Sequence, residues 1–180
     1  MDSVLNSVNT ALTSSNKTVL EIPALTFYIG NEKSRRICNT GIGRLENLSF
    51  KRIEDIGFYE CDNIQHVYGY IRLTDFQFNY PSFTVNDEIG DKGSIEVGAY
   101  RNKIFVRLSI QKVNDLFKME VDKVQAVKIL DIDFNTNNLE RIAGYFGQLQ
   151  DCILGIIYGT VFPLLEQTLQ RELTRAITNI

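Results

Sequence analysis

The C-terminal part of the chain has two successive apolar patterns. From Cys152 to Leu165 the sequence reads CILGIIYGTVFPLL without a charged side chain, and from there to Ile177 an apolar residue recurs every fourth position. The first stretch is apolar on every side of a helix and has to be surrounded, whereas the second needs cover on one face only. The first stretch is also shorter than the roughly 20 residues that cross a bilayer. The pattern predicts a long helix over residues 148–178, enclosed by protein, kinked at Pro163 and not an integral membrane segment.

A shorter helix is predicted at the other end of the chain. In residues 3–12 the apolar side chains fall on one helical face, and Thr13–Asn16 ends the pattern. Between the two helices, apolar residues mostly alternate with polar ones, which is the period of half-buried strands. The predicted strands are residues 42–50, 53–60 and 64–86, the two arms of a hairpin in 94–112, and a further pair in 116–121 and 124–134.

Polar residues mark where these strands turn. Asp62–Asn63 predicts one turn, Arg101–Lys103 predicts the tip of the hairpin, and Asp122–Lys123 predicts the turn of the last pair. Within residues 64–86 the alternation changes phase after Asp75, which predicts a β-bulge where the sheet bends.

The order of these elements indicates the fold class. A helix, five to seven antiparallel strands and a long helix contain no βαβ unit, so a doubly wound parallel sheet is not expected. The length of 180 residues and the 44% hydrophobic content suit a single domain over residues 1–180. We therefore predict an α+β fold, in which a strongly curved antiparallel sheet wraps around the long C-terminal helix and the shorter N-terminal helix.

The interior of such a roll has two interpretations. Gly155 and Gly159 form a GxxxG spacing in the apolar helix, and this spacing lets a backbone or a bulky group approach closely. The glycines fit an apolar cavity that holds a ligand, and they equally fit Phe side chains packed tightly against the helix. The sequence leaves both interpretations open.

Charge and catalytic motifs exclude several classes of function. The net charge is −3 and no basic run occurs, so a nucleic-acid-binding face is not expected. His66 is the only histidine, and no GxSxG elbow accompanies it. Asp131 and Asp133 share one face of a strand, opposite Ile132, which indicates a solvated face rather than paired catalytic carboxylates. We expect no enzyme activity, no cofactor and no metal site.

Three cysteines, Cys38, Cys61 and Cys152, form no CxxC pair, and a single histidine does not complete a zinc site. One disulfide with one free thiol and a fully reduced state both remain open. We favour a Cys38–Cys61 disulfide, because a hairpin that turns near residues 50–53 would bring its two ends together. Cys152 would then be a free thiol that behaves as a small hydrophobic residue.

Several segments together resemble a known family. They read GIGRLENLSFKRIEDIGF, VYGYIRLTDFQFNY, NKIFVRLSIQKV, VKILDIDF and LERIAGYFGQLQDCILGIIYGTVFPLLEQTLQRELTRAI. Over residues 35–178 this resembles the arthropod group 7 mite-allergen proteins, members of the tubular lipid-binding (TULIP) superfamily together with bactericidal/permeability-increasing and takeout-like proteins. The strongest pieces are Gly41–Phe50 and the C-terminal LEQTLQRELTRAI. The resemblance implies a curved sheet around long helices, secretion, and non-catalytic binding of an apolar small molecule or lipid.

No motif of the family fixes a ligand contact, so the strand phase and the helix face supply the expected lining. The residues expected to line the cavity are Phe76, Phe78, Tyr80, Val106, Leu108, Ile156, Ile157, Val161 and Leu165. Arg72, Tyr68 and Tyr100 are expected as polar groups at its mouth. The sequence shows no signal-peptide pattern, so secretion is expected on the resemblance alone. The alternative function is a protein-interaction or homodimerisation module of the same fold with a filled core.

Overall fold

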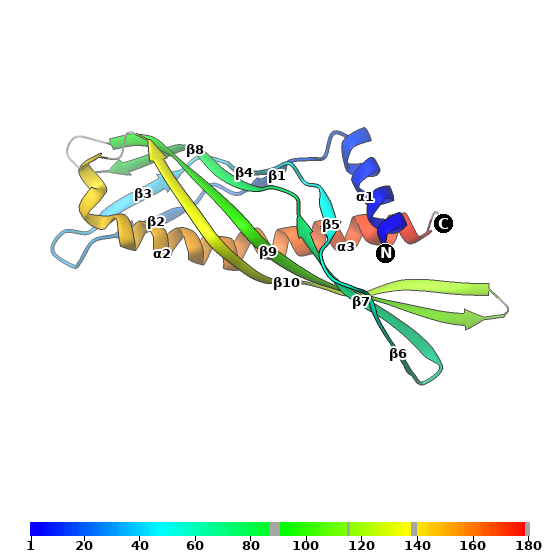
Figure 1. Ribbon diagram of the computed structural model, residues 1–180. Coiled ribbons are helices and arrows are strands. Elements are labelled where there is room, and N and C mark those ends of the chain that lie inside the picture. Colours follow the sequence, from blue (N-terminus) through cyan, green and yellow to red (C-terminus); the bar gives the residue numbers. More distant parts are fainter. Residues whose placement is uncertain (87–90, 115, 138–139, 179–180) are drawn as a thin grey trace.

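The fold is an elongated antiparallel sheet that lies along a long C-terminal helix (Figure 1). A computed structural model of the chain describes residues 1–86, 91–114, 116–137 and 140–178. The helical elements are α1 (Asp2–Ser14), the 3₁₀ turn η1 (Glu140–Tyr145), α2 (Phe146–Ile156), the π-helical turn η2 (Ile157–Val161) and α3 (Phe162–Thr178). The short strands are β1 (Leu20–Ile22), β2 (Thr26–Ile29), β3 (Arg36–Thr40), β4 (Gly43–Glu46), β5 (Phe50–Arg52) and β6 (Gly57–Cys61). The longer strands are β7 (Ile64–Leu73), β8 (Phe76–Asn86), β9 (Asp91–Val113) and β10 (Leu116–Asn137).

The sheet reaches the C-terminal helix from both ends of its strand order. β9 is the central strand, with β10 on one side and β7 and β8 on the other. In β10, the Ala126 N–H donates to Glu166 Oε1 of α3 at 2.7 Å. After β2, the Gly30 N–H donates to Gln148 Oε1 of α2 at 2.6 Å. Because opposite ends of the sheet bond to one helical rod, the predicted α+β fold with a sheet curved around the C-terminal helix is confirmed.

At one level of the sheet, the alternation of inward-facing and outward-facing side chains shifts by one residue. The shift occurs along β7 and its continuation β8, along β9, and along β10. Leu73 of β7 and Phe76 of β8 are both buried although they are three residues apart, and β7 and β8 keep a single register against β9. Opposite this break, Tyr100 and Arg101 of β9 are consecutive exposed residues. In β10 the backbone of Asp131 has a left-handed φ of 53°. The sheet therefore twists here as a unit, so that the apolar face follows the helix on both sides of the break.

Asn102 holds the strands together at this break. Its side chain is 8% exposed, its Oδ1 accepts a hydrogen bond from the Leu73 N–H at 2.7 Å, and its Nδ2 donates to the Leu73 carbonyl at 3.2 Å. The amide of Asn102 thus supplies both bonds that a backbone partner would otherwise make with Leu73. A buried backbone group without such a partner is costly.

Two predicted turns are wrong because a strand continues through each of them. Arg101–Lys103 is not a hairpin tip, because β9 continues through it and Asn102 is a buried strand residue. Asp122–Lys123 is not a turn either, since β10 continues and only shifts register there. The chain reverses after β9 instead, where Asn114 has a left-handed φ of 49°. The turn at Asp62–Asn63 is confirmed, with φ values of 53° and 62°.

The β-bulge predicted after Asp75 is also misplaced. The pairing of β7 and β8 with β9 inserts no extra residue at Asp75, so the change of phase there is a twist. The register shift of β8 lies between Tyr80 and Phe83, where Pro81 has no N–H to donate to the ladder.

The C-terminal helix changes its winding just before Pro163. At the end of η2 the Phe162 N–H bonds to the Ile157 carbonyl, five residues back, and α3 then continues to Thr178. Pro163 has no N–H for the carbonyl four residues earlier, so a wider turn accommodates it. The predicted irregularity at Pro163 is therefore a π-helical turn that precedes the proline.

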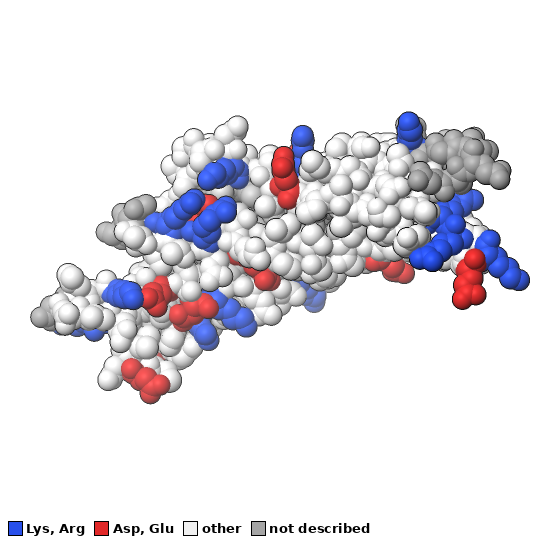
Figure 2. Space-filling view, turned by 180° about the vertical axis from the view of Figure 1, so that it is seen from behind, with Lys and Arg blue, Asp and Glu red and all other residues white. Residues whose placement is uncertain are grey.

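The helix is enclosed on one side only. Its buried residues recur along one face, from Leu149 and Ile153 to Leu173, whereas Gly155, Tyr158 and Gly159 on the other side are exposed. The expectation of complete enclosure is thus wrong. The face opposite to the view of Figure 1 has a broad middle stretch without charged residues, between basic groups toward its ends (Figure 2).

The helical stretch from Ala143 to Thr178 is long and apolar enough to cross a membrane by length and composition, with 33% of its most apolar window buried. Core helices of proteins that do not enter a membrane meet the same condition. Here the buried face of the helix packs on the sheet, and α1 covers α3 near the two termini (Figure 1).

We predict that Asn102→Leu lowers the free energy of unfolding by about 2–3 kcal/mol, because the Leu73 N–H and carbonyl lose their buried partners. Urea unfolding measured by circular dichroism checks this value. Asn135→Ala, at an exposed position of β10, is the control and is expected to change stability by less than about 0.5 kcal/mol. Equal stability of the two variants would contradict the role assigned to Asn102.

Candidate functional site

The residues expected to line a cavity lie in the apolar core between sheet and helix. Of the nine, all but Ile156 are buried, and Ile156 is half-buried against the same core. Three lie on β8 (Phe76, Phe78, Tyr80), two on β9 (Val106, Leu108), and four on the helical rod (Ile156, Ile157, Val161, Leu165). These positions establish an apolar interior, and they leave the role of these residues as ligand contacts a prediction.

The break in the sheet divides the expected lining into two groups. On one side, the rings of Phe78 and Tyr80 meet edge to face, with centroids 5.0 Å apart and an interplanar angle of 78°. On the other side, Val106 and Leu108 belong to the part of β9 that pairs with β7. The nine residues are therefore spread along the core rather than gathered around one point.

Gly43 is part of this interior, and no pattern in the sequence points to it. A Cβ atom at position 43 would lie 2.5 Å from Cε1 of Tyr80, which is too close for any side chain. The Tyr80 hydroxyl donates to the Pro23 carbonyl at 3.3 Å, so this ring is fixed at both ends. Gly43 thus allows β4 to pass over a fully buried tyrosine. Only the three-dimensional pairing of β4 with β8 shows this contact.

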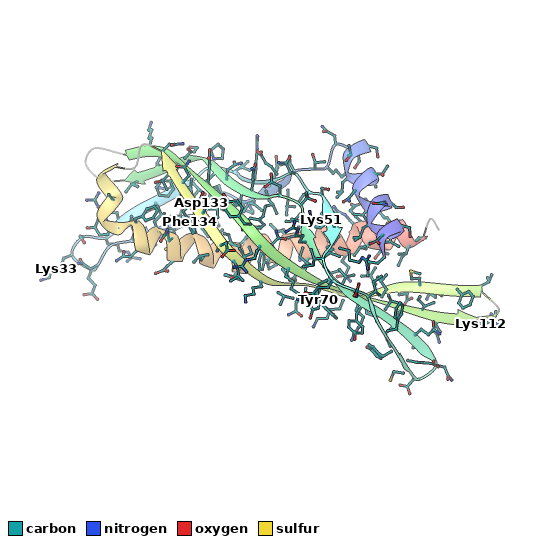
Figure 3. The ribbon with its side chains drawn as sticks, viewed as in Figure 1. Lys33, Lys51, Tyr70, Lys112, Asp133 and Phe134 are labelled. Carbon is teal, nitrogen blue, oxygen red and sulfur yellow. The ribbon has the colours of Figure 1, made fainter. Side chains whose placement is uncertain are left out.

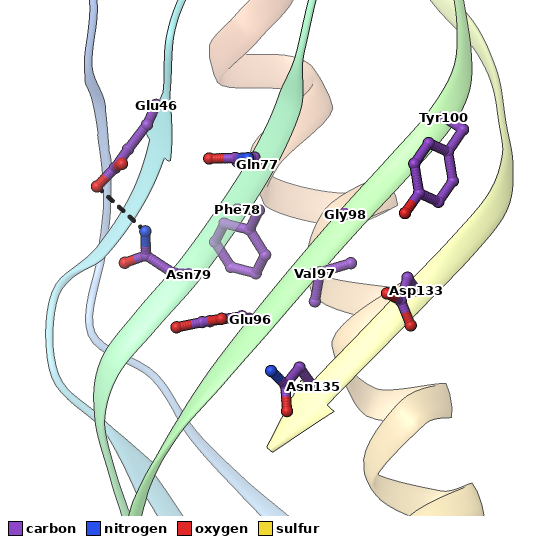
Figure 4. Close-up of a pocket in the computed structure, with 10 residues that line it drawn as sticks. All are labelled: Glu46, Gln77, Phe78, Asn79, Glu96, Val97, Gly98, Tyr100, Asp133 and Asn135. Atoms are coloured by element: carbon purple, nitrogen blue, oxygen red, sulfur yellow. Dashed lines mark hydrogen bonds between the residues drawn. The ribbon is translucent and has the colours of Figure 1, made fainter. Parts of the chain in front are cut away.

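A polar cleft of about 370 Å³ opens on the outer face of the sheet, away from the helix (Figure 4). In its wall, Asn79 Nδ2 donates to Glu46 Oε1 at 3.2 Å. Phe78 is the one member of the predicted cavity lining that also borders it. The cleft is lined by Glu46, Gln77, Phe78, Asn79, Glu96, Val97, Gly98, Tyr100, Asp133 and Asn135.

The polar groups expected at the mouth of a cavity lie elsewhere. Arg72 is flanked by the buried residues Ile71 and Leu73, so its side chain is on the outer face of the sheet. Tyr100 is 73% exposed and borders the polar cleft. Both positions depend on which face of the sheet each side chain points to, and the break shifts this alternation by one residue.

The candidate catalytic residues are separated in the structure. Asp131 forms an ion pair with Arg101, and the hydrogen bond from that guanidinium lowers the pKa of Asp131. Asp133 lies in the polar cleft instead. His66 Nδ1 lies 2.9 Å from Asp122 Oδ2, and the imidazole stacks on the Tyr59 ring at 4.6 Å. Within the described residues, no cluster of three or more His, Cys, Asp or Glu side chains is arranged to hold a metal ion.

The predicted Cys38–Cys61 disulfide is wrong, because both thiols are free. β3, which carries Cys38, pairs with β2 and β8, whereas β6, which ends at Cys61, pairs with β7. The two strands are therefore not partners in a hairpin. Burial, followed by the neighbouring Cys152 thiol, raises the pKa of Cys38 to about 11. Burial also raises the pKa of Cys152, whose Sγ lies 3.9 Å from the Tyr28 carbonyl.

A second cleft, of about 350 Å³, separates α1 from α3 and contains a buried carboxylate. Glu172 is 4% exposed and accepts hydrogen bonds of 3.0 Å from Arg171 Nε and from Arg175 Nη1. Burial acts to raise the pKa of Glu172, but the two guanidinium groups outweigh it, so that pKa lies below its usual value of 4.5.

Comparisons with known proteins give similarity of structure and not of sequence. No protein-family model matches the chain, and no curated protein matches it. A crystal structure of a lipopolysaccharide binding protein is similar over 97% of this chain and 37% of that chain, with 11% sequence identity and a TM-score of 0.49. This chain thus spans 37% of the length of that one. At this identity and TM-score the similarity does not establish a family, and the group 7 mite-allergen assignment stays a prediction.

The state of the cysteines gives the first prediction for this region. Under non-reducing conditions the intact mass should correspond to three free thiols, and a mass lower by two hydrogens would contradict this. In the native protein, a thiol reagent should modify exposed Cys61 first, Cys152 more slowly, and Cys38 only on unfolding, because its thiolate is disfavoured. Cys61→Ser should remove the fast phase alone.

The second prediction concerns acid stability. The folded-state pKa of Glu172 is lowered, so its ion pairs contribute fully above about pH 4.5 and their contribution is lost as pH falls through the folded-state pKa. Glu172→Gln should lower the free energy of unfolding by about 1–3 kcal/mol at neutral pH and make it less dependent on pH below 4.5. Urea unfolding at neutral pH and below pH 4.5 measures both effects. Glu60→Gln, at an exposed position, is the control. If both variants behave like the wild type, the ion pairs of Glu172 contribute nothing.

Proposed function

We propose that the protein binds a hydrophobic small molecule or lipid, without catalysis, in the apolar region between the curved sheet and the C-terminal helix. The observation that carries this proposal is the chemistry of the interior. Among the described residues, the buried polar or charged ones are Thr40, Asn102 and Glu172, and each is hydrogen-bonded within the fold. The other buried residues form the hydrophobic core between sheet and helix, which suits a ligand that is held by loss of water contact.

The α2 half of the helix is the side from which a ligand would reach this interior. Ile156 is half-buried, and the helix next to it is exposed at Gly155 and Gly159. The π-helical turn η2 separates this half from α3, and such turns are frequent at functional sites. A small outward movement of α2 would expose Ile153 and Ile157 to a ligand without disturbing the packing of α3 on β10.

The affinity of such binding can be bounded by area. Covering about 300 Å² of apolar ligand surface contributes about 7.5 kcal/mol before the cost of association is subtracted. Micromolar affinity is therefore the upper limit for a contact area of this size, because the cost of association weakens the binding further. The resemblance to group 7 mite-allergen proteins supports the proposal, and secretion is part of the same proposal.

A homodimer is the second candidate function, and the uncovered side of α2 favours it. Tyr158 is 49% exposed, it stacks edge to face on Phe162 at 5.2 Å, and exposed glycines flank it. A second copy of the chain could cover this uncharged stretch (Figure 2). In that case the interior would stay filled by its own side chains.

Two substitutions, one at the end of α2 and one in η2, separate the candidates. Ile156→Glu places a charge at the edge of the interior and should weaken binding of an uncharged fluorescent fatty alcohol at least about tenfold. Tyr158→Glu places the same charge on the outer side of the helix and should leave fatty-alcohol binding unchanged. Thermal unfolding of both variants shows whether the fold is retained.

The other outcomes are equally defined. Native mass spectrometry of the purified wild type should show a bound lipid that organic extraction releases. If the wild-type protein takes up no fatty alcohol and sediments as a dimer that Tyr158→Glu dissociates, the homodimer replaces lipid binding as the proposed function.

A further inference from the structure

Four basic residues form a row across four adjacent strands on the outer face of the sheet. Lys51 of β5 is the register partner of Arg72 of β7, and Lys103 of β9 is the register partner of Lys128 of β10. The register of β7 and β9 ends with the pair Ile71 and Ile104, and Arg72 and Lys103 are the next residues beyond this pair on their strands. Like charges that face each other across strands destabilise a sheet. The four like charges of the row therefore lower the stability of the sheet.

The row is only partly neutralised. Lys103 Nζ lies 2.5 Å from Glu54 Oε1 and 3.7 Å from the centre of the Tyr70 ring. Lys51, Arg72 and Lys128 form no ion pair with another described residue. Lys51 and Tyr70 lie near the crossing of β5, β7 and β9, away from Asp133 on β10 (Figure 3).

Three of these cations border an apolar cleft of about 280 Å³. Ile53 and Leu130 supply its apolar wall, and the Asn102 amide is already occupied by Leu73. Arg72 lines the cleft, and its Nε is buried without a hydrogen-bond partner. A buried guanidinium donor without an acceptor is unusual in folded proteins and calls for one. The cleft is lined by Ile53, Arg72, Arg101, Asn102, Lys103, Lys128 and Leu130.

The geometry points to a binding site for an anionic amphiphile in this cleft, with its oxyanion head group on Arg72 and Lys128 and its alkyl part against Ile53 and Leu130. A carboxylate or phosphate oxygen would relieve the repulsion along the row, and a small movement of the Arg72 side chain would let that oxygen accept a hydrogen bond from the buried Nε. An uncharged lipid would leave the cations unpaired. This site is separate from the interior proposed for hydrophobic ligands, because it lies on the opposite face of the sheet.

The polar cleft on the same outer face gives the contrast. It carries Glu46, Glu96 and Asp133, so an anion is disfavoured there. The two clefts lie on either side of the break in the sheet. Because one cleft is lined by basic and the other by acidic side chains, an anionic head group is expected in the basic cleft.

Isothermal titration with octyl phosphate tests the proposal directly. Wild-type protein should bind octyl phosphate, and Lys128→Gln, at an exposed position, should weaken the binding at least about tenfold. Arg72→Lys, which keeps the charge and loses the Nε donor, should weaken it as well. Lys33→Gln, in the remote loop between β2 and β3, is the matched control and should bind like the wild type (Figure 3).

Two further ligands test the parts of the head-group and alkyl assignment. Inorganic phosphate should bind at least about tenfold more weakly than octyl phosphate, because it has no apolar part. Octyl glucoside, which is uncharged, should show no loss of affinity in Lys128→Gln. Equal binding of octyl phosphate by the wild type, Lys128→Gln and Arg72→Lys would overturn the proposal, and so would equal affinity for inorganic and octyl phosphate.

The source of the head group is distinguished by vesicles. Co-flotation with phosphatidic-acid vesicles, lost in Lys128→Gln and absent with phosphatidylcholine, would support a membrane lipid. Binding of octyl phosphate without co-flotation would support a soluble amphiphile. Uptake of the uncharged fatty alcohol that Ile156→Glu abolishes and Lys128→Gln retains would show that the interior and the outer cleft are independent.

Discussion

The packing of one apolar sheet face against one side of a long helix is the constraint on which the structure depends. A twisted sheet does not follow a straight helical rod over its whole length in one phase. Here three strands change phase together, and Asn102 bonds to Leu73 where β7 gives way to β8. The core therefore continues from Tyr80 on one side of the break to Val106 on the other without an exposed gap.

The same break organises the outer face. It places Tyr100 and Arg101 side by side toward solvent, where a regular strand would turn one of them inward. A polar cleft lies on one side of this level, and the cleft bordered by Arg72 and Lys128 lies on the other. One twist in three strands thus sets the shape of the apolar interior and the separation of charges outside it.

Binding rather than catalysis is proposed because the buried polar side chains of the interior already have hydrogen-bond partners within the fold. Asn102 completes a strand ladder, Glu172 holds two arginines of α3, and Thr40 bonds to Leu25. Each of these side chains is used by the fold. The helix contributes further, because its uncovered side leaves Tyr158 and two glycines available to a ligand or to a second copy.

The sequence by itself determined the elements whose signal is local. The apolar period predicted the two helices, the alternation predicted the inward residues of β8 and β9 although it divided β9 and β10 wrongly, and Asp62–Asn63 marked a real turn. The tertiary structure decided whatever depends on partners far along the chain. Arg101–Lys103 reads as a turn until Leu73 is seen to bond Asn102, and Cys38 and Cys61 are separated because their strands pair elsewhere. The basic row has the same origin, because register alone brings together residues from four separate strands, and one chain read in order carries no information on register.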